Sequence, residues 1–230
     1  MKQRRYILIL IFTGFIIDGS FAQELRTQFG DVYYDVNMHR GQYNGTLGSP
    51  YLNEVFVPCK INEIPETQLA RFNAYNGTVE VKISKTKVVL LGDAVTYIIR
   101  LNDGSGKTYY TGNYYDSKGE LKNSFFELIH ESDAFDLYLK EKIKYNKAVK
   151  AEGYKDAEPP SFKKADGSYF ITDLWEKTPR LVLLPKRTSA FMELFPGQAK
   201  ALKKFSREQK LKLDNAEDLV QIINHALLLN

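Results

Sequence analysis

Short runs of β-branched and aromatic residues, separated by turn residues, constrain the fold of this chain more than any other feature of its sequence. They begin at Asn53 and continue to about residue 185, with Gly, Asp, Asn and Ser clustered between them. This pattern is typical of antiparallel strands joined by tight turns. We therefore expect an α+β fold, in which a mainly antiparallel meander or sandwich-like sheet is followed by a helical segment of about three helices.

The clearest local signal is Asn76-Gly77, which predicts a hairpin over residues 70–83. The pair favours a two-residue type I′ turn, because both residues tolerate positive φ. Such a turn places Phe72 opposite Val81, with apolar side chains on one face of the hairpin and polar side chains on the other. The sequence therefore predicts the register as well as the strands.

Further strands are predicted where short apolar runs recur between turn residues. Residues 147–160 interrupt them with Gly, Asp and a Pro-Pro pair, and are expected to form a linker or long loop. The other strands are expected at residues 31–36, 87–91, 95–101, 108–115, 123–130 and 134–145, with two or three more around 166–167 and 180–184.

Beyond the predicted sheet, the apolar residues recur with a helical period. Two helices are predicted within residues 188–195 and 198–207, and Thr188 is expected to cap the first. A third helix follows Asp214, which forms a capping-box pattern with Glu217. Its apolar stripe must be covered, so we expect this helix to close one side or end of the sheet.

The first 22 residues have the features of a signal peptide. A basic head precedes an apolar stretch over residues 6–17, and Ser20 and Ala22 stand where signal peptidase requires small side chains. This stretch is shorter than a bilayer-spanning helix needs, so cleavage is expected rather than an uncleaved anchor. We expect export to the periplasm, the cell surface or the exterior, with no transmembrane segment after cleavage.

The remaining residues, 23–230, are expected to form one domain with a β-rich part at 50–185 and a helical part at 186–230. The formal net charge is +4, from 32 Lys and Arg against 28 Asp and Glu, so no nucleic-acid partner is expected. The single cysteine, Cys59, excludes a disulfide scaffold. Its apolar neighbours favour a small buried hydrophobe over a reactive thiol.

Several short motifs, which consist of turn and strand residues, resemble those of a known group. They are GSPYLN at residues 48–53, RFNAYN at 71–76, VEVK at 79–82, Leu194-Phe195 and the tail at 211–219. On these motifs the chain resembles a group of uncharacterised exported proteins of Bacteroidota with no assigned activity. The resemblance implies a bacterial envelope location and adds no site.

The sequence contains no motif with a defined chemistry. Residues 103–108 (DGSGKT) end like a phosphate-binding loop, but Leu101 occupies the position of its first Gly and strand-forming residues follow, so a hairpin turn is predicted. His130, Ser132 and Asp133 lie in one turn, where neighbours rarely reach the geometry of a catalytic triad. We therefore predict no catalytic residue, no cofactor and no metal.

Tyrosines and a basic stretch supply the only candidate binding surface. Because a strand sends adjacent side chains to opposite faces, half of the strand tyrosines are expected to be exposed and able to stack on a ligand. The alternatives are simple strand propensity for the tyrosines and a solvated helix face for the basic residues. The candidate residues are Tyr110, Tyr115, Tyr138, Lys203 and Arg207.

Three functions remain open. The first is a non-catalytic envelope protein that acts by binding or structural association, with an envelope protein or a polysaccharide as partner. The second is a tyrosine-lined module that binds a glycan or a peptide. The third is a hydrolase whose carboxylates meet only in the folded chain, and it requires a concave pocket where two or more acids converge.

Overall fold

The computed structural model describes residues 33–35, 43–85, 87–91, 96–154, 156–172 and 180–229. The predicted signal peptide at residues 1–22 lies outside the described residues, as do both ends of the predicted strand at 31–36 and the start of the one at 95–101. Among the described residues, no helix is long and apolar enough to cross a membrane.

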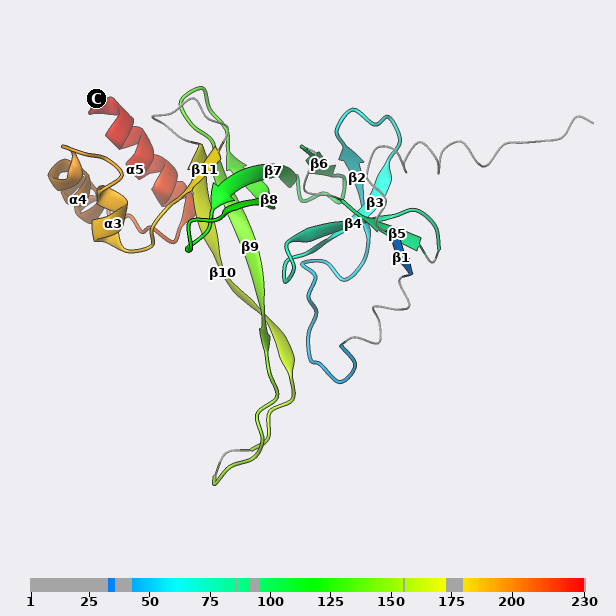
Figure 1. Cartoon of the computed structure of the whole chain (residues 1–230). Coiled ribbons are helices and arrows are strands. Elements are labelled where there is room, and N and C mark those ends of the chain that lie inside the picture. Colours follow the sequence, from blue (N-terminus) through cyan, green and yellow to red (C-terminus); the bar gives the residue numbers. More distant parts are fainter. Residues whose placement is uncertain are drawn as a thin grey trace, which may run out of the picture.

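The described part of the chain forms eleven strands followed by three helices (Figure 1). The strands are β1 (Tyr33–Asp35), β2 (Val57–Ile61), β3 (Gln68–Asn73), β4 (Thr78–Lys82), β5 (Lys87–Leu90), β6 (Ile98–Leu101), β7 (Thr108–Tyr115), β8 (Leu121–His130), β9 (Leu137–Asn146), β10 (Ser161–Thr172) and β11 (Arg180–Leu183). The helices are α3 (Thr188–Met192), α4 (Ala199–Glu208) and α5 (Ala216–Leu228).

All eleven strands belong to one hydrogen-bonded sheet, in the order β1-β5-β4-β3-β2-β6-β7-β11-β10-β9-β8. Every pairing is antiparallel except that of β11 with β7. The predicted α+β class and the mainly antiparallel sheet are thus confirmed. The pairing order differs from a simple meander, because β2 pairs with β6 and β11 returns to β7.

Five strands form a closed ring, because β8 pairs with β7 as well as with β9. The ring runs β7-β11-β10-β9-β8 and leaves no free edge along its paired segments. Its interior holds Phe126, Tyr138 and Phe170, all buried, with the rings of Phe126 and Phe170 4.9 Å apart in an edge-to-face arrangement. Partly buried side chains complete this cluster: Tyr110, Tyr114, Leu128 and Leu181.

The ring separates two larger cores. On one side, Tyr109, Phe125, Ile143 and Phe162 face the apolar side chains of β2 to β6. On the other side, side chains of β9, β10 and β11 pack against the three helices, which lie at the far end of the molecule from the N-terminal strands (Figure 1). The prediction that the third helix closes one side or end of the sheet is therefore confirmed for α5.

The β3–β4 hairpin exists, but its register differs from the prediction by two residues. Phe72 lies opposite Val79, not Val81, and four residues form the loop instead of two. The cause is Asn73, whose side-chain Oδ1 accepts hydrogen bonds from the backbone N–H groups of Tyr75 (3.2 Å) and Asn76 (3.0 Å). Only Gly77 has positive φ (+74°) in this loop, so the turn is not type I′.

Other local predictions were wrong in detail. One strand, β10, spans the region predicted as separate segments around 166–167, and a bulge between Ala165 and Ser168 takes up the irregularity. Helix α5 is capped by Asn215, whose side chain accepts from the backbone N–H of Asp218, one residue after the predicted cap. Thr188 lies inside α3, whose N-cap makes no side-chain bond.

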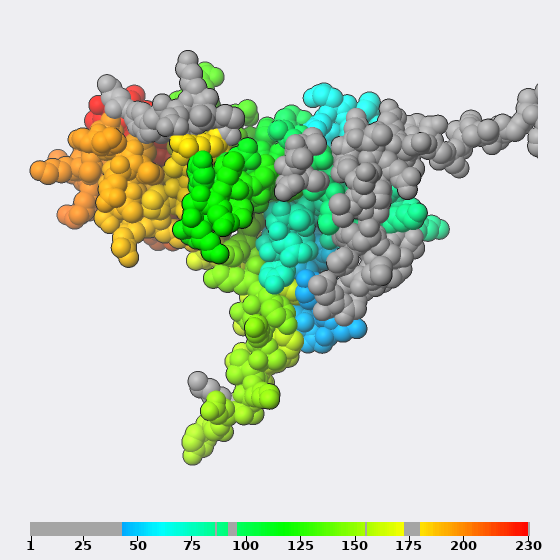
Figure 2. All heavy atoms as spheres, viewed as in Figure 1, coloured from blue at the N-terminus to red at the C-terminus, as the bar shows by residue number. Residues whose placement is uncertain are grey.

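Strands β9 and β10 continue beyond the ring as a two-stranded ribbon that projects from the molecule (Figures 1 and 2). We call this ribbon the arm and define it as residues 140–165, of which residue 155 lies outside the described part. Residues 147–160 form its tip, without any strand, as predicted, and Val149 pairs there with Glu158 in an isolated bridge.

Cys59 is buried in the core beside the N-terminal strands, and burial raises the pKa of its thiol to about 11. Because the unfolded chain loses this proton near pH 9, the stability tied to the protonated thiol is present below pH 9 and lost as the pH rises to 11. We expect unfolding in urea to show a loss of about 2 kcal/mol across that interval. Cys59→Ala should have a shallower loss, and equal slopes for the two proteins would contradict the prediction.

Candidate functional site

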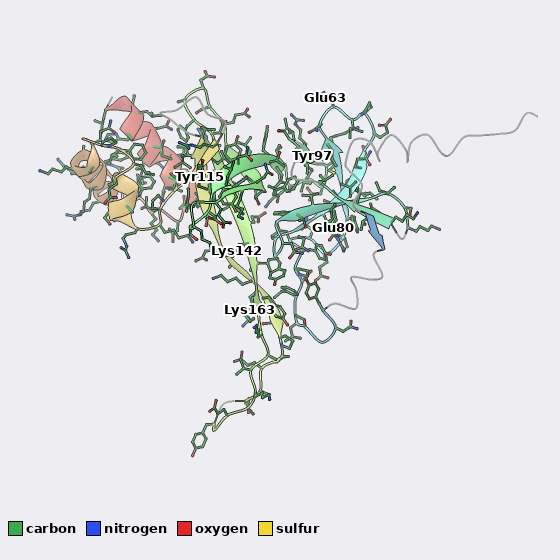
Figure 3. The ribbon with its side chains drawn as sticks, viewed as in Figure 1. Glu63, Glu80, Tyr97, Tyr115, Lys142 and Lys163 are labelled. Atoms are coloured by element: carbon green, nitrogen blue, oxygen red, sulfur yellow. The ribbon has the colours of Figure 1, made fainter. Side chains whose placement is uncertain are left out.

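The five residues predicted to form a binding surface do not lie together. Tyr138 is buried inside the ring, and Tyr110 packs against it, with ring centroids 6.0 Å apart. Tyr115 is 49% exposed at the end of β7 (Figure 3), whereas Lys203 and Arg207 are exposed on α4. Strand alternation did send neighbouring tyrosines to opposite faces, but the ring and the N-terminal core cover both faces. In the part of the chain that the structure describes, β7 therefore presents no row of exposed tyrosines.

A polar pocket of about 380 Å³ lies where the base of the arm meets the N-terminal strands. Its volume falls in the range of small-molecule sites. The chain segment 49–54 forms one wall, and β9, β10 and Lys107, which directly precedes β7, supply the other. The lining residues are Ser49, Tyr51, Leu52, Asn53, Glu54, Lys107, Glu141, Ile143, Phe162 and Lys164.

Backbone hydrogen bonds hold the wall segment against both β3 and β10. The N–H of Leu52 donates to the carbonyl of Phe72 (3.0 Å), and the N–H of Phe162 donates to the carbonyl of Leu47 (2.8 Å). Gly48, with φ of +75°, allows the close approach, because a Cβ there would lie 2.6 Å from the carbonyl oxygen of Phe162. The wall is therefore positioned by backbone contacts that a side chain at this position would break.

Glu141 forms the floor of the pocket and is only 6% exposed. The hydroxyl of Tyr109 donates to its Oε2 at 2.9 Å. The ammonium groups of Lys107 and Lys164 lie 3.6 and 3.5 Å from its Oε1. A buried charge requires such partners, because burial removes it from water.

Lys107 links this floor to a second buried carboxylate, Glu127, whose Oε2 lies 2.8 Å from the Lys107 ammonium. Burial raises the pKa of Glu127 despite the opposing hydrogen bond from Lys107. Burial alone would lower the pKa of Lys107, but its hydrogen bond to Glu127 and the charge of Glu141 outweigh that effect and raise it. Burial, followed by the charges of the two carboxylates, raises the pKa of Tyr109. These groups form one coupled network with two cations and two anions.

Another buried ion pair, outside the pocket lining, holds Tyr51 of the wall segment. The Nε of Arg71 lies 2.7 Å from Oε2 of Glu80, and the Tyr51 hydroxyl donates to Oε1 of the same carboxylate at 2.8 Å. The Arg71 guanidinium also lies over the rings of Tyr51 (3.7 Å) and Phe56 (4.5 Å). Burial and the neighbouring Glu80 charge raise the pKa of Tyr51. Tyr51 is thereby fixed in the wall as a neutral phenol.

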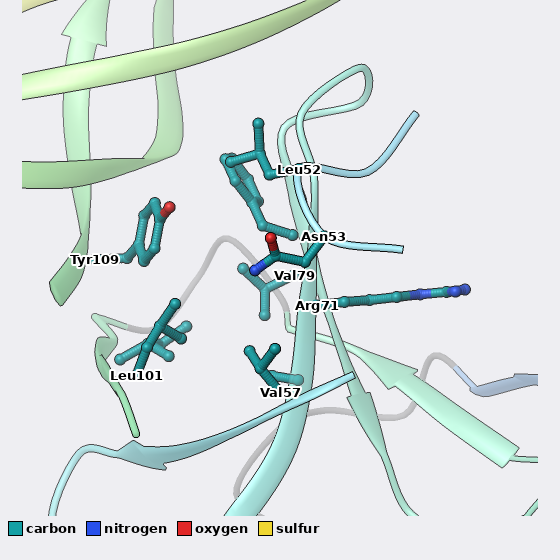
Figure 4. A pocket seen from close by; sticks show the side chains of 10 residues that line it. Leu52, Asn53, Val57, Arg71, Val79, Leu101 and Tyr109 are labelled. Carbon is teal, nitrogen blue, oxygen red and sulfur yellow. The ribbon is translucent and has the colours of Figure 1, made fainter. Parts of the chain in front are cut away.

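A small apolar cavity of about 20 Å³ adjoins the pocket, with which it shares Leu52 and Asn53. Figure 4 shows Val79, Leu101 and Tyr109 around this cavity, with the Arg71 side chain directed away from it. A space of this size holds about one water molecule, and its largely apolar lining offers water few partners. We therefore assign it to the core and not to a ligand site.

The sequence contained one signal for this site that the prediction missed. Along β9, Leu137 and Ile143 are buried, and Glu141 occupies a position on the same alternation. A carboxylate on an apolar face indicates a buried partner or a site. Its partners are distant in sequence and could not be identified from it: Lys107 directly before β7, Tyr109 on β7 and Lys164 on β10.

No family model, curated protein or solved structure matches this chain. Within the described residues, no three His, Cys, Asp or Glu side chains are grouped so that they could hold a metal ion. The function must therefore be argued from the pocket and from the surface of the chain itself.

Proposed function

We propose that the protein is a non-catalytic binding protein that holds a neutral saccharide in the polar pocket at the base of the arm. The observation that carries this proposal is the internal balance of charge in the pocket floor. Lys107 is shared by Glu127 and Glu141, and Lys164 also faces Glu141. Because these charges compensate one another, a ligand need not bring a charge of its own.

The same groups keep hydrogen-bonding capacity for a ligand. An ammonium group has three N–H donors and a carboxylate about four acceptor sites. Lys164, with its side chain 73% exposed, faces a single carboxylate, so two of its donors remain. Glu141 has three neighbouring donors, which leaves about one acceptor site. A ligand with several hydroxyl groups, which both donate and accept, matches this mixture.

Apolar side chains complete the pocket. Leu52, Ile143 and Phe162 line it beside the polar groups. A sugar ring presents C–H groups on its faces and hydroxyl groups at its rim, so it can use both kinds of lining. This preserves the glycan-binding hypothesis but moves it from the predicted tyrosines to the base of the arm.

The arrangement of the carboxylates favours binding over hydrolysis. Glycoside hydrolysis uses two carboxyl groups on opposite sides of the scissile bond, one of which must carry a proton. Glu127, whose pKa is raised, does not line the pocket and is bonded to Lys107. Three donors surround the Glu141 carboxylate, so it is not free to act on a ligand by itself. Glu54, the other carboxylate that lines the pocket, is exposed on the facing wall, so only one lining carboxylate is not already held by hydrogen-bond donors.

The proposal also places the protein outside the cytoplasm. It is supported by the basic head, the short apolar stretch and the small residues of the first 22 positions. The resemblance to exported proteins of Bacteroidota supports it as well. An envelope or extracellular location would expose the pocket to glycans.

The test uses cellobiose, maltose and chitobiose as neutral probes in saturation-transfer NMR and calorimetry. At least one should bind, and Lys164→Met should weaken its binding about tenfold, because it removes two free donors. Lys118→Met, which removes an exposed lysine from the β7–β8 turn, is the matched control and should leave the affinity unchanged.

Three outcomes would overturn the proposal. They are the absence of saturation transfer to all three disaccharides, equal effects of the two lysine substitutions, and cleavage of a bound disaccharide detected by chromatography. The last outcome would favour the hydrolase hypothesis. Circular dichroism of both variants verifies that the fold is retained.

A further inference from the structure

Strand register places a row of lysines on one face of the arm. In β9, Lys142 and Lys144 are two residues apart and therefore point to the same side. Lys163 of β10 lies directly opposite Lys144 and shares that side. All three side chains are exposed, and Figure 3 labels Lys142 and Lys163 along the projecting ribbon. We call these three residues the lysine stripe.

The stripe has no compensating acid on the protein. Among the described residues, no carboxylate lies within ion-pair distance of Lys142, Lys144 or Lys163. The nearest lysine along the strand, Lys140, points the same way but is held by the hydroxyl and ring of Tyr114. Like charges directly opposite each other, such as Lys144 and Lys163, destabilise a strand pair. The stripe therefore does not serve the stability of the arm.

The opposite face of the same strands has a different character. Glu141 and Ile143 are buried there, and the ring of Tyr145 packs against Phe162 at 5.2 Å. That face belongs to the pocket and the core, whereas the stripe face meets solvent. In the paired stretch of the ribbon, the lysine stripe thus lies on the face opposite the pocket and the core.

We propose that the lysine stripe binds a linear anionic polysaccharide. Alternate residues of a strand are about 6.6–6.8 Å apart, so Lys142 and Lys144 present two positive charges along an extended partner, and Lys163 adds a third beside Lys144. Three features favour a carboxylated glycan over a nucleic acid. The charges are all lysine, which acts as a point charge and lacks the phosphate-matching fork of arginine. No aromatic side chain shares this face in the paired stretch 142–146 with 161–165, so bases would find no stacking platform. On this face of the paired stretch the charge is a group of three lysines and not a broad basic surface.

The experiment measures binding of polygalacturonate to the full chain at 50 mM NaCl, with neutral dextran and a thymidine oligonucleotide as comparison probes. The wild-type protein should bind polygalacturonate, bind dextran weakly or not at all, and lose affinity as salt rises because of screening. Lys142→Gln, Lys144→Gln and Lys163→Gln combined should reduce affinity for polygalacturonate at least tenfold.

A second triple variant removes the same charge elsewhere. Lys200→Gln, Lys210→Gln and Lys212→Gln alter exposed lysines in and after α4 and should leave the affinity within about twofold of wild type. Equal losses in the two triple variants would overturn the proposal, because net charge would then explain binding. Tighter binding of the oligonucleotide at equal charge concentration would overturn it in favour of nucleic acid. Retained thermal melting of both variants shows that the arm substitutions act on binding.

Discussion

Phe126→Ala is expected to lower the free energy of unfolding by about 3–5 kcal/mol. Phe126 is completely buried inside the ring, where its aromatic ring lies 4.9 Å from that of Phe170 and 5.7 Å from that of Tyr114. Truncation leaves a cavity that strands closed into a ring cannot collapse to fill. The loss of unfolding free energy therefore combines the transfer free energy of the Phe126 side chain with the cost of the cavity.

Equilibrium unfolding in urea at neutral pH measures this effect. The control is Tyr115→Ala, which removes an aromatic side chain of the same strand pairing that is half exposed, and its effect should be much smaller. A loss for Phe126→Ala no larger than that for Tyr115→Ala would show that the ring interior does not hold the strands together. An unchanged m-value would indicate that the variant unfolds as cooperatively as the wild type.

Local patterns predicted most strands but not the contacts between distant ones. Segments such as β5, β7 and β8 were predicted within two residues of their observed ends, because each carries its own alternation and its own turn signals. The ring depends on the parallel pairing of β11 with β7, in which Leu181 meets Tyr114. Nothing in either segment indicates the other, since parallel pairing requires a long connection.

The β3–β4 hairpin shows how a local signal can give the correct face and the wrong register. Phe72 and Val79 both remain in the core, because a shift of two residues keeps every side chain on its face. The Asn73 side chain caps the loop and so lengthens it. The type I′ prediction rested on the central pair Asn76-Gly77 alone. It did not consider that a side chain just before the turn can compete for the backbone N–H groups of the loop.

From the sequence, only one residue of the candidate site could be recognised, as an exception to the strand pattern. Glu141 breaks the apolar alternation of β9, but its partners come from β7, the residue directly before it, and β10. The predicted tyrosines failed as a surface for a related reason. Alternation determines which side chains share a face, whereas tertiary packing determines whether that face meets water, and both faces of β7 are covered around Tyr109 and Tyr110.

Glu80→Ala is expected to cost about 3–5 kcal/mol of unfolding free energy, because it leaves a buried cation without its partner. Glu80 is only 3% exposed, and it accepts bonds from both Arg71 and Tyr51. Replacing both ion-pair members with apolar residues, as Arg71→Met with Glu80→Leu, should cost far less, since no charge then remains buried. Urea unfolding of Arg71→Met, Glu80→Leu and the double variant completes a mutant cycle that isolates the pair.

The matched control for this pair is Glu120→Ala. The Glu120 carboxylate lies 2.6 Å from the Lys122 ammonium, about as close as the Glu80 carboxylate lies to Arg71. In the Glu120–Lys122 pair, however, both side chains are about half exposed. Water and salt screen such a pair, so its removal should leave the unfolding midpoint unchanged. Equal effects at the two sites would show that burial does not decide the strength of these bridges. Because the Glu80 pair also fixes Tyr51 in the pocket wall, Glu80→Ala should weaken disaccharide binding, whereas Glu120→Ala should not.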